Sequence, residues 1–150
     1  MTDPLDTLDR WRPYAPLLIR GFVGFVLVYG TQDNVLHPAR MLEFRDFLAA
    51  SGFPYPLFCA HLSAYAQFAA GILVLAGVAT RWAALAMAVN FVVALAMVHV
   101  GLPFGSNVAP LAMLFGSLHL LVNGPGPFSL RDALPARAGA GPTRAVPRPG

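Results

Sequence analysis

Histidine and tyrosine side chains are the groups in this 150-residue sequence whose chemistry suggests a ligand site. His37, His61, His99, Tyr29 and Asp33 are all expected near the same end of the apolar segments beside them. Imidazole and phenol groups in an apolar cleft can donate hydrogen bonds to the head group of a quinone, which needs only one or two such partners. Tyr29, His61 and His99 are therefore the candidate quinone-binding residues.

The same side chains could serve other chemistries. Three histidines and an aspartate could bind a metal ion, and two histidines on facing helices could ligate a haem. No histidine pair has the i, i+4 spacing on one helix that is typical of a metal site, so we predict no metal-binding residues. His119 is expected toward the opposite end and is assigned a structural role. No nucleophile–base pair is present, so no catalytic residues are assigned.

Polar side chains inside the apolar segments need partners, because lipid offers none. Gln67 lies on a helix face of small residues and Asn90 is flanked by alanines, so we expect the two amides to pair across a helix interface. Gly71 shares the face of Gln67 and would let a neighbouring helix approach closely. Arg20 is expected to reach the membrane surface or to pair with an acid in a partner chain. Arg20, Gln67, Gly71 and Asn90 are thus assigned to helix packing.

The composition is that of a membrane protein. Hydrophobic residues make up 57% of the chain and charged residues 11%, whereas about a quarter of a soluble domain is charged. No charged residue occurs between Asp46 and Arg81 or between Arg81 and Arg131. The arginines show no nucleic-acid-binding pattern, so no such partner is expected. The single cysteine, Cys59, excludes an internal disulfide and a Cys-x-x-Cys redox pair.

Four apolar segments are long enough to cross about 30 Å of hydrocarbon as helices. They lie in a membrane domain over residues 13–132, between a polar leader at 1–12 and a disordered basic tail at 133–150. The expected spans cover approximately residues 15–36, 57–79, 82–102 and 108–123.

The segment between the first two spans, Asp33–Ser51, mixes charged residues with an apolar helical stripe. This pattern is typical of a helix that lies along the membrane surface. Gly52-Phe53-Pro54-Tyr55-Pro56 should end that helix, and Thr80-Arg81 should form the tight turn between the second and third spans. The sequence therefore predicts an all-α integral membrane four-helix bundle with a short interfacial helix between the first and second spans.

The arginines predict the orientation of the bundle. With four spans, both termini and the turn at Arg81 share one side of the membrane, and that side carries most of the arginines. They are Arg10, Arg12, Arg81, Arg131, Arg137, Arg144 and Arg148, against Arg40 and Arg45 on the other side. We therefore expect a multi-pass protein of a bacterial inner membrane with both termini in the cytoplasm.

Several short motifs, in this order and spacing, resemble the DoxX family of membrane proteins. They are Leu-Ile-Arg20-Gly21, Tyr29-Gly30, Gly52-Phe53-Pro54-Tyr55-Pro56, Gly71-Ile-Leu-Val-Leu-Ala-Gly77-Val-Ala-Thr80-Arg81, Val98-His99 and Gly124-Pro125-Gly126-Pro127-Phe128-Ser129-Leu130. The resemblance covers roughly residues 15–132. It implies a four-helix membrane bundle associated with redox chemistry, since some members resemble subunits of thiosulfate:quinone oxidoreductase. The chain departs from the family in having Gln67 where Glu is common, and Gln32-Asp33-Asn34 where Lys is frequent.

Two functional hypotheses follow. The first is a membrane subunit of a quinone-linked oxidoreductase system that anchors redox partners and forms a quinone pocket at the outer face, without being catalytic alone. The second is a structural or assembly subunit of a larger membrane complex with no chemistry of its own. Both make the lipid bilayer a partner, together with other protein subunits or further copies of the chain. Passage of a solute has less support, because no internal repeat or acid within a span is present.

Overall fold

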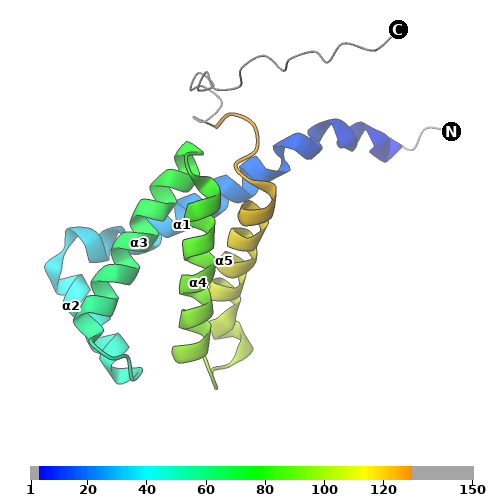
Figure 1. Cartoon of the computed structure of the whole chain (residues 1–150). Helices are drawn as coiled ribbons and strands as arrows, with labels where there is room; N and C mark the ends of the chain where they lie inside the picture. Colours follow the sequence, from blue (N-terminus) through cyan, green and yellow to red (C-terminus); the bar gives the residue numbers. More distant parts are fainter. Residues whose placement is uncertain (1–3, 130–150) are drawn as a thin grey trace, which may run out of the picture.

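The computed structural model describes residues 4–129, and this part of the chain is helical without a β-strand. The elements are the 3-10 helix η1 (Pro4–Tyr14) and the α-helices α1 (Ala15–Leu36), α2 (Pro38–Ala50), α3 (Pro56–Ala76), α4 (Thr80–Met97) and α5 (Phe104–Asn123) (Figure 1). Of these described elements, α1, α3, α4 and α5 are long and apolar enough to cross a membrane. The predicted all-α bundle of four spans, with a short helix between the first and second, is confirmed.

The helix bounds lie close to the expected spans, and proline marks several of them. Pro38 and Pro56 occupy the first turns of α2 and α3, where a missing N–H costs nothing. α4 ends at Met97, before the expected limit at Leu102, and α5 already begins at Phe104. The predicted tail at 133–150 lies outside the described residues.

The turn between α3 and α4 covers residues 77–79 and therefore lies earlier in the sequence than expected. Gly77 adopts a left-handed conformation with φ 71°, its N–H donates to Val74 O, and the N–H of Val78 donates to Leu73 O. This pair of bonds is the Schellman ending of a helix, which favours glycine at the left-handed position. The expectation of a turn at Thr80-Arg81 is therefore wrong, because both residues already belong to the first turn of α4.

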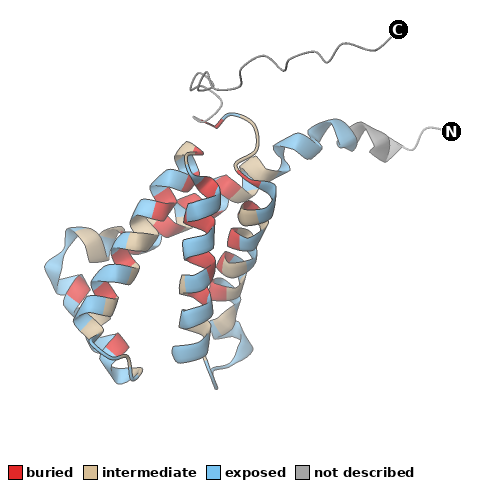
Figure 2. Ribbon diagram, viewed as in Figure 1, coloured by how far each residue is buried: buried red, intermediate tan, exposed pale blue. Residues whose placement is uncertain are grey.

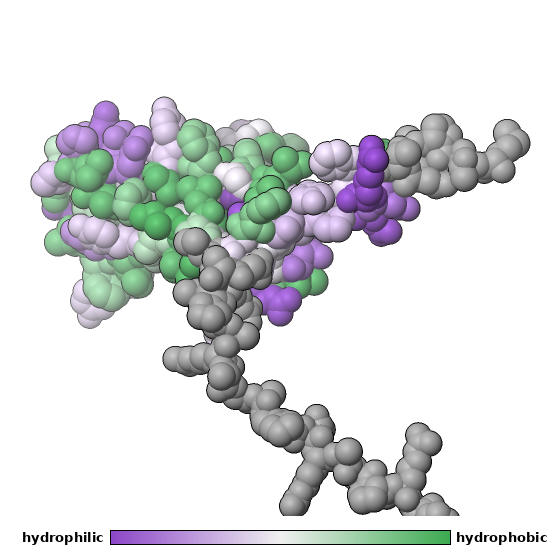
Figure 3. Space-filling model, turned by 90° about the horizontal axis from the view of Figure 1, so that it is seen from above, coloured by the Kyte–Doolittle hydropathy of each residue, from purple (hydrophilic) through white to green (hydrophobic). Residues whose placement is uncertain are grey.

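The spanning helices pack in two closely associated pairs, α1 with α3 and α4 with α5, which α3 and α4 join. Buried residues lie along their inner faces (Figure 2), and the core includes Val23, Leu27, Val74, Met87 and Leu120. Their outward faces carry exposed large apolar side chains, and Figure 3 shows hydrophobic residues over much of the visible surface of the bundle. Such a surface suits lipid rather than water.

Helix α2 packs against α3 and α1 through its apolar side. Met41 and Leu48 are buried there, next to Ala60 and Ala64 of α3. The charged residues of α2 face outward in the pairs Arg40–Glu43 and Arg45–Asp46, with nitrogen–oxygen distances of 2.8 and 2.7 Å. α2 thus covers one side of the α1–α3 pair, while Leu42 and Phe47 remain exposed beside its charged residues.

Arg20 closes the end of the bundle at which α3 passes into α4. Its guanidinium is buried within the protein, with 6% of the residue exposed. Nη1 donates to Pro125 O at 2.9 Å and Nη2 to Phe128 O at 3.1 Å. Nearby, Arg81 Nη2 donates to Val122 O at 3.3 Å. We call this region, formed by Arg20, Arg81 and residues 124–129, the arginine end.

Candidate ligand-binding cavity

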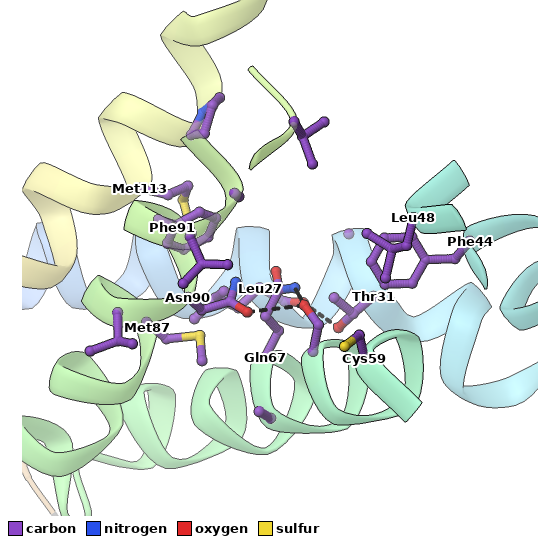
Figure 4. Close-up of a pocket in the computed structure, with 18 of the residues that line it drawn as sticks. Leu27, Thr31, Phe44, Leu48, Cys59, Gln67, Met87, Asn90, Phe91 and Met113 are labelled. Atoms are coloured by element: carbon purple, nitrogen blue, oxygen red, sulfur yellow. Dashed lines mark hydrogen bonds between the residues drawn. The ribbon is translucent and has the colours of Figure 1, made fainter. Parts of the chain in front are cut away.

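A cavity of about 680 Å³ lies among the four spanning helices, where the main core meets the smaller core beneath α2. In Figure 4, Phe91 and Met113 lie on one side of this cavity and Phe44 and Leu48 on the other. Most of its surface is apolar. Its volume falls within the range of roughly 300–1,000 Å³ that small-molecule sites usually have.

Three polar side chains form a hydrogen-bonded group on the cavity wall, which we call the amide cluster: Ser63, Gln67 and Asn90. Gln67 Nε2 donates to Ser63 Oγ at 2.9 Å, and Ser63 Oγ donates to Asn90 Oδ1 at 3.0 Å (Figure 4). Gln67 and Asn90 therefore meet across the α3–α4 interface through Ser63 rather than directly. This arrangement leaves the Gln67 carbonyl oxygen as an acceptor and the Asn90 amide nitrogen as a donor for a ligand.

His99 and Ser106 add polar groups to the cavity lining. The Nδ1 atom of His99 is buried and has no hydrogen-bond partner within residues 4–129. Pro110 also lines the cavity and cannot donate to the carbonyl oxygen of Ser106, one turn earlier in α5. This part of the wall thus combines an unpaired imidazole nitrogen with a carbonyl that lacks its helical donor.

Two other polar side chains of the lining already have backbone partners. Thr31 Oγ1 donates to Leu27 O at 2.6 Å, and Cys59 Sγ donates to Pro54 O at 3.2 Å. Within residues 4–129, no group of three or more histidine, cysteine, aspartate or glutamate side chains is placed to bind a metal ion. The described cavity is therefore suited to an apolar molecule with a few hydrogen-bonding atoms.

The structure separates the three candidate quinone-binding residues. His99 lines the cavity, but Tyr29 and His61 do not. Tyr29 is 66% exposed, and His61 is exposed with Nδ1 2.9 Å from the carbonyl oxygen of Leu57 in its own helix. The two residues lie on outward faces of α1 and α3.

The residues assigned to packing lie in two places. Gln67 and Asn90 belong to the amide cluster, and Arg20 lies at the arginine end. Gly71 lies at the α1–α3 contact, where a Cβ atom would be 3.0 Å from the backbone nitrogen of Val28. Ser63 was not among the candidate residues, although its position four residues before Gln67 places both on one helix face.

The fold and the cavity define a multi-pass membrane protein with a largely apolar, ligand-sized cavity that opens between its helices. The sequence model named DoxX matches residues 15–100, more than half of the chain, and the protein belongs to the DoxX family. No curated protein and no solved structure matches the chain significantly.

Proposed function

We propose that this DoxX protein is a membrane subunit of a quinone-linked oxidoreductase system and holds the quinone in the cavity beside the amide cluster. The observation that carries the proposal is a cavity of about 680 Å³ whose apolar wall bears one convergent group of amides and a hydroxyl. Apolar side chains can enclose a quinone ring, while the few polar groups orient its oxygen atoms.

The free hydrogen-bonding groups of the amide cluster suit both oxidation states of such a ligand. The Asn90 NH₂ group can donate to a carbonyl oxygen of the quinone, and the Gln67 carbonyl oxygen can accept from a hydroxyl of the quinol. The bound quinone would supply two-electron redox chemistry. The chain's own part is to bind and orient this ligand through the groups that line the cavity.

Replacing Asn90 by leucine is expected to lower the quinone content of the purified protein at least about fivefold, the effect of losing roughly 1 kcal/mol of hydrogen bonding. Leucine has a similar size, so the cavity keeps its shape while the donor is lost. The measurement is the quinone extracted per chain after mild solubilisation from the native membrane. Ala86→Phe, at an exposed position that lines the cavity, should lower the content by occlusion.

The matched controls are His61→Ala and Tyr29→Phe, which change polar groups on outward helix faces and should retain the quinone. If the controls lost quinone while Asn90→Leu retained it, the quinone would bind at Tyr29 and His61 on the outward helix faces instead of in the cavity. Quinone-free wild-type protein would contradict the proposal as a whole.

The alternative function is a structural or assembly subunit of a larger membrane complex. It is favoured by the hydrogen bonds within the amide cluster, which already join α3 to α4 without a ligand. Under this alternative, the protein copurifies with a larger partner and carries no quinone. The same purification therefore decides between the two functions.

We also propose that the protein lies in a bacterial inner membrane with both termini in the cytoplasm. The arginine excess on the terminal side supports this orientation, because basic loops are retained on the cytoplasmic side. Green fluorescent protein fused to the C-terminus should fluoresce, while alkaline phosphatase fused there should be inactive. The phosphatase fused after Gly52, in the loop before α3, should be active; the reverse pattern would overturn the orientation.

A further inference from the structure

Among the described residues, no carboxylate pairs with the two arginines of the arginine end. Within residues 4–129, the carboxylate partners of arginines belong to three other pairs: Arg12–Asp9, Arg40–Glu43 and Arg45–Asp46. Arg20 and Arg81 instead donate to backbone carbonyl oxygens of the segment at the end of α5. Carbonyl groups satisfy the donors but leave two full charges on this end of the bundle, and Arg81 is exposed.

A second, smaller pocket opens beside these charges. It has a volume of about 260 Å³ and is lined by Gly77, Ala79, Thr80, Arg81, Trp82 and Pro125. We call it the α4 pocket, because three of these residues form the start of α4. The first N–H groups of a helix lack partners inside the helix and carry the positive end of its dipole. The start of an 18-residue helix beside an arginine is therefore an electrostatic environment for an anion.

Thr80 provides an independent indication of a ligand. Only 2% of the residue is exposed, and its Oγ1 atom is buried without a hydrogen-bond partner among the described residues. An unsatisfied buried hydroxyl costs about 1–3 kcal/mol, so such a group usually has a partner that the protein itself does not supply. Thr80 lines the α4 pocket, so an oxygen atom of an anion bound there would supply the missing acceptor for this hydroxyl.

We propose that the α4 pocket binds a phosphate group, and that this phosphate is the head group of an anionic phospholipid. Tetrahedral oxyanions match the available donors, which are the Arg81 guanidinium, the Thr80 hydroxyl and the backbone N–H groups of Thr80 and Arg81, since those of Trp82 and Ala83 already donate to Ala79 O. The pocket lies at the end of two spanning helices, where lipid head groups lie. Trp82 is 75% exposed beside it, as expected of a tryptophan at the membrane–water interface.

The proposed lipid site is independent of the proposed quinone site. The α4 pocket and the large cavity share no lining residue. A failure of lipid binding therefore leaves the quinone proposal unaffected, and the reverse also holds.

Fluorescence of Trp82 tests the lipid site in the full-length protein. Trp11→Phe makes Trp82 the only tryptophan of the chain. The protein is reconstituted in bilayers of brominated phosphatidylcholine, which quenches Trp82, and unbrominated phosphatidylglycerol or phosphatidylcholine is then added. Phosphatidylglycerol should relieve quenching at least about fivefold more effectively than unbrominated phosphatidylcholine, and less so at high salt, because salt screens exposed charges.

Matched variants assign this preference to the α4 pocket. Thr80→Val removes the hydroxyl at nearly constant volume and should reduce the preference about fivefold, while Thr80→Ser should keep it. Arg81→Gln should reduce it further, and Arg81→Lys should restore part of it. Arg40→Gln, which removes an arginine on α2, should change nothing. Circular dichroism confirms that each variant is folded.

The outcomes separate the possible sources of the phosphate. Equal effects of both lipids, or a phosphatidylglycerol preference that survives in Thr80→Val and Arg81→Gln, would overturn the lipid site. In phosphatidylcholine bilayers, a saturable fluorescence change with inorganic phosphate, lost in both variants, would identify free phosphate as the ligand instead. Absence of both responses would overturn the phosphate site itself.

Discussion

Replacing Arg20 by leucine is expected to lower the free energy of unfolding by about 3 kcal/mol or more, since each hydrogen bond to a charged donor contributes roughly 1.5–3 kcal/mol. The guanidinium is buried and donates to Pro125 O and Phe128 O, so its removal leaves two carbonyl groups without these donors. The segment after α5 should then detach from α1. Unfolding followed by circular dichroism in detergent measures the first effect, and hydrogen exchange of residues 124–129 measures the second.

Other arginine variants separate this role from a general effect of charge. Arg20→Lys keeps the charge, but a single ammonium group cannot match the two spaced donors of the guanidinium, so we expect an intermediate loss. Arg12→Leu changes a side chain that is 80% exposed and should alter stability by less than about 0.5 kcal/mol. If Arg20→Leu were as stable as Arg12→Leu, the two carbonyl bonds would not hold this end of the bundle together.

The four spans were predictable from the sequence because an uncharged segment of helical length has few alternatives to crossing a bilayer. Glycine and proline also mark the boundary before α3 clearly, at Gly52–Pro56. The turn after α3 is expected at Thr80-Arg81 but begins at Gly77, three residues earlier. Gly77 carried the correct signal, since glycine is the preferred residue where a helix ends in the left-handed conformation.

The candidate site was only partly accessible from the sequence. The order of the spans tells which end of the bundle a residue lies near, and His99 does line the cavity. The order of the spans does not tell how each helix is rotated about its own axis. Tyr29 lies between the inward-facing Leu27 and Thr31 and therefore points outward. On α3, Ala60 is buried and the next residue, His61, is exposed. Only the packed structure reveals these rotations.

The α1–α3 contact depends on glycine for a geometric reason. A Cβ atom at Gly71 would lie 2.8 Å from Val28 Cγ2, 2.9 Å from Leu27 Cβ and 3.0 Å from the backbone nitrogen of Val28. Side-chain atoms can move, but a backbone nitrogen moves only with its helix. Gly24 lies on the other side of the same contact, where an added Cβ atom would be 2.6 Å from Leu75 Cγ and 3.1 Å from the backbone oxygen of Gly71.

Gly71→Ala is therefore expected to separate α1 from α3 and to cost about 2–3 kcal/mol, the upper part of the range for overpacked cores. The double variant Gly71→Ala/Val28→Ala should recover only part of this loss, because it removes the methyl contact and leaves the backbone contact. Gly21→Ala is the matched control: no atom lies within 4 Å of its added Cβ, so the substitution should be neutral or stabilise α1. Thermal unfolding of the four proteins in one detergent measures all three effects. Full rescue in the double variant would mean that the α1 and α3 backbones lie farther apart than in this structure, and that close packing at Gly71 does not hold the pair together.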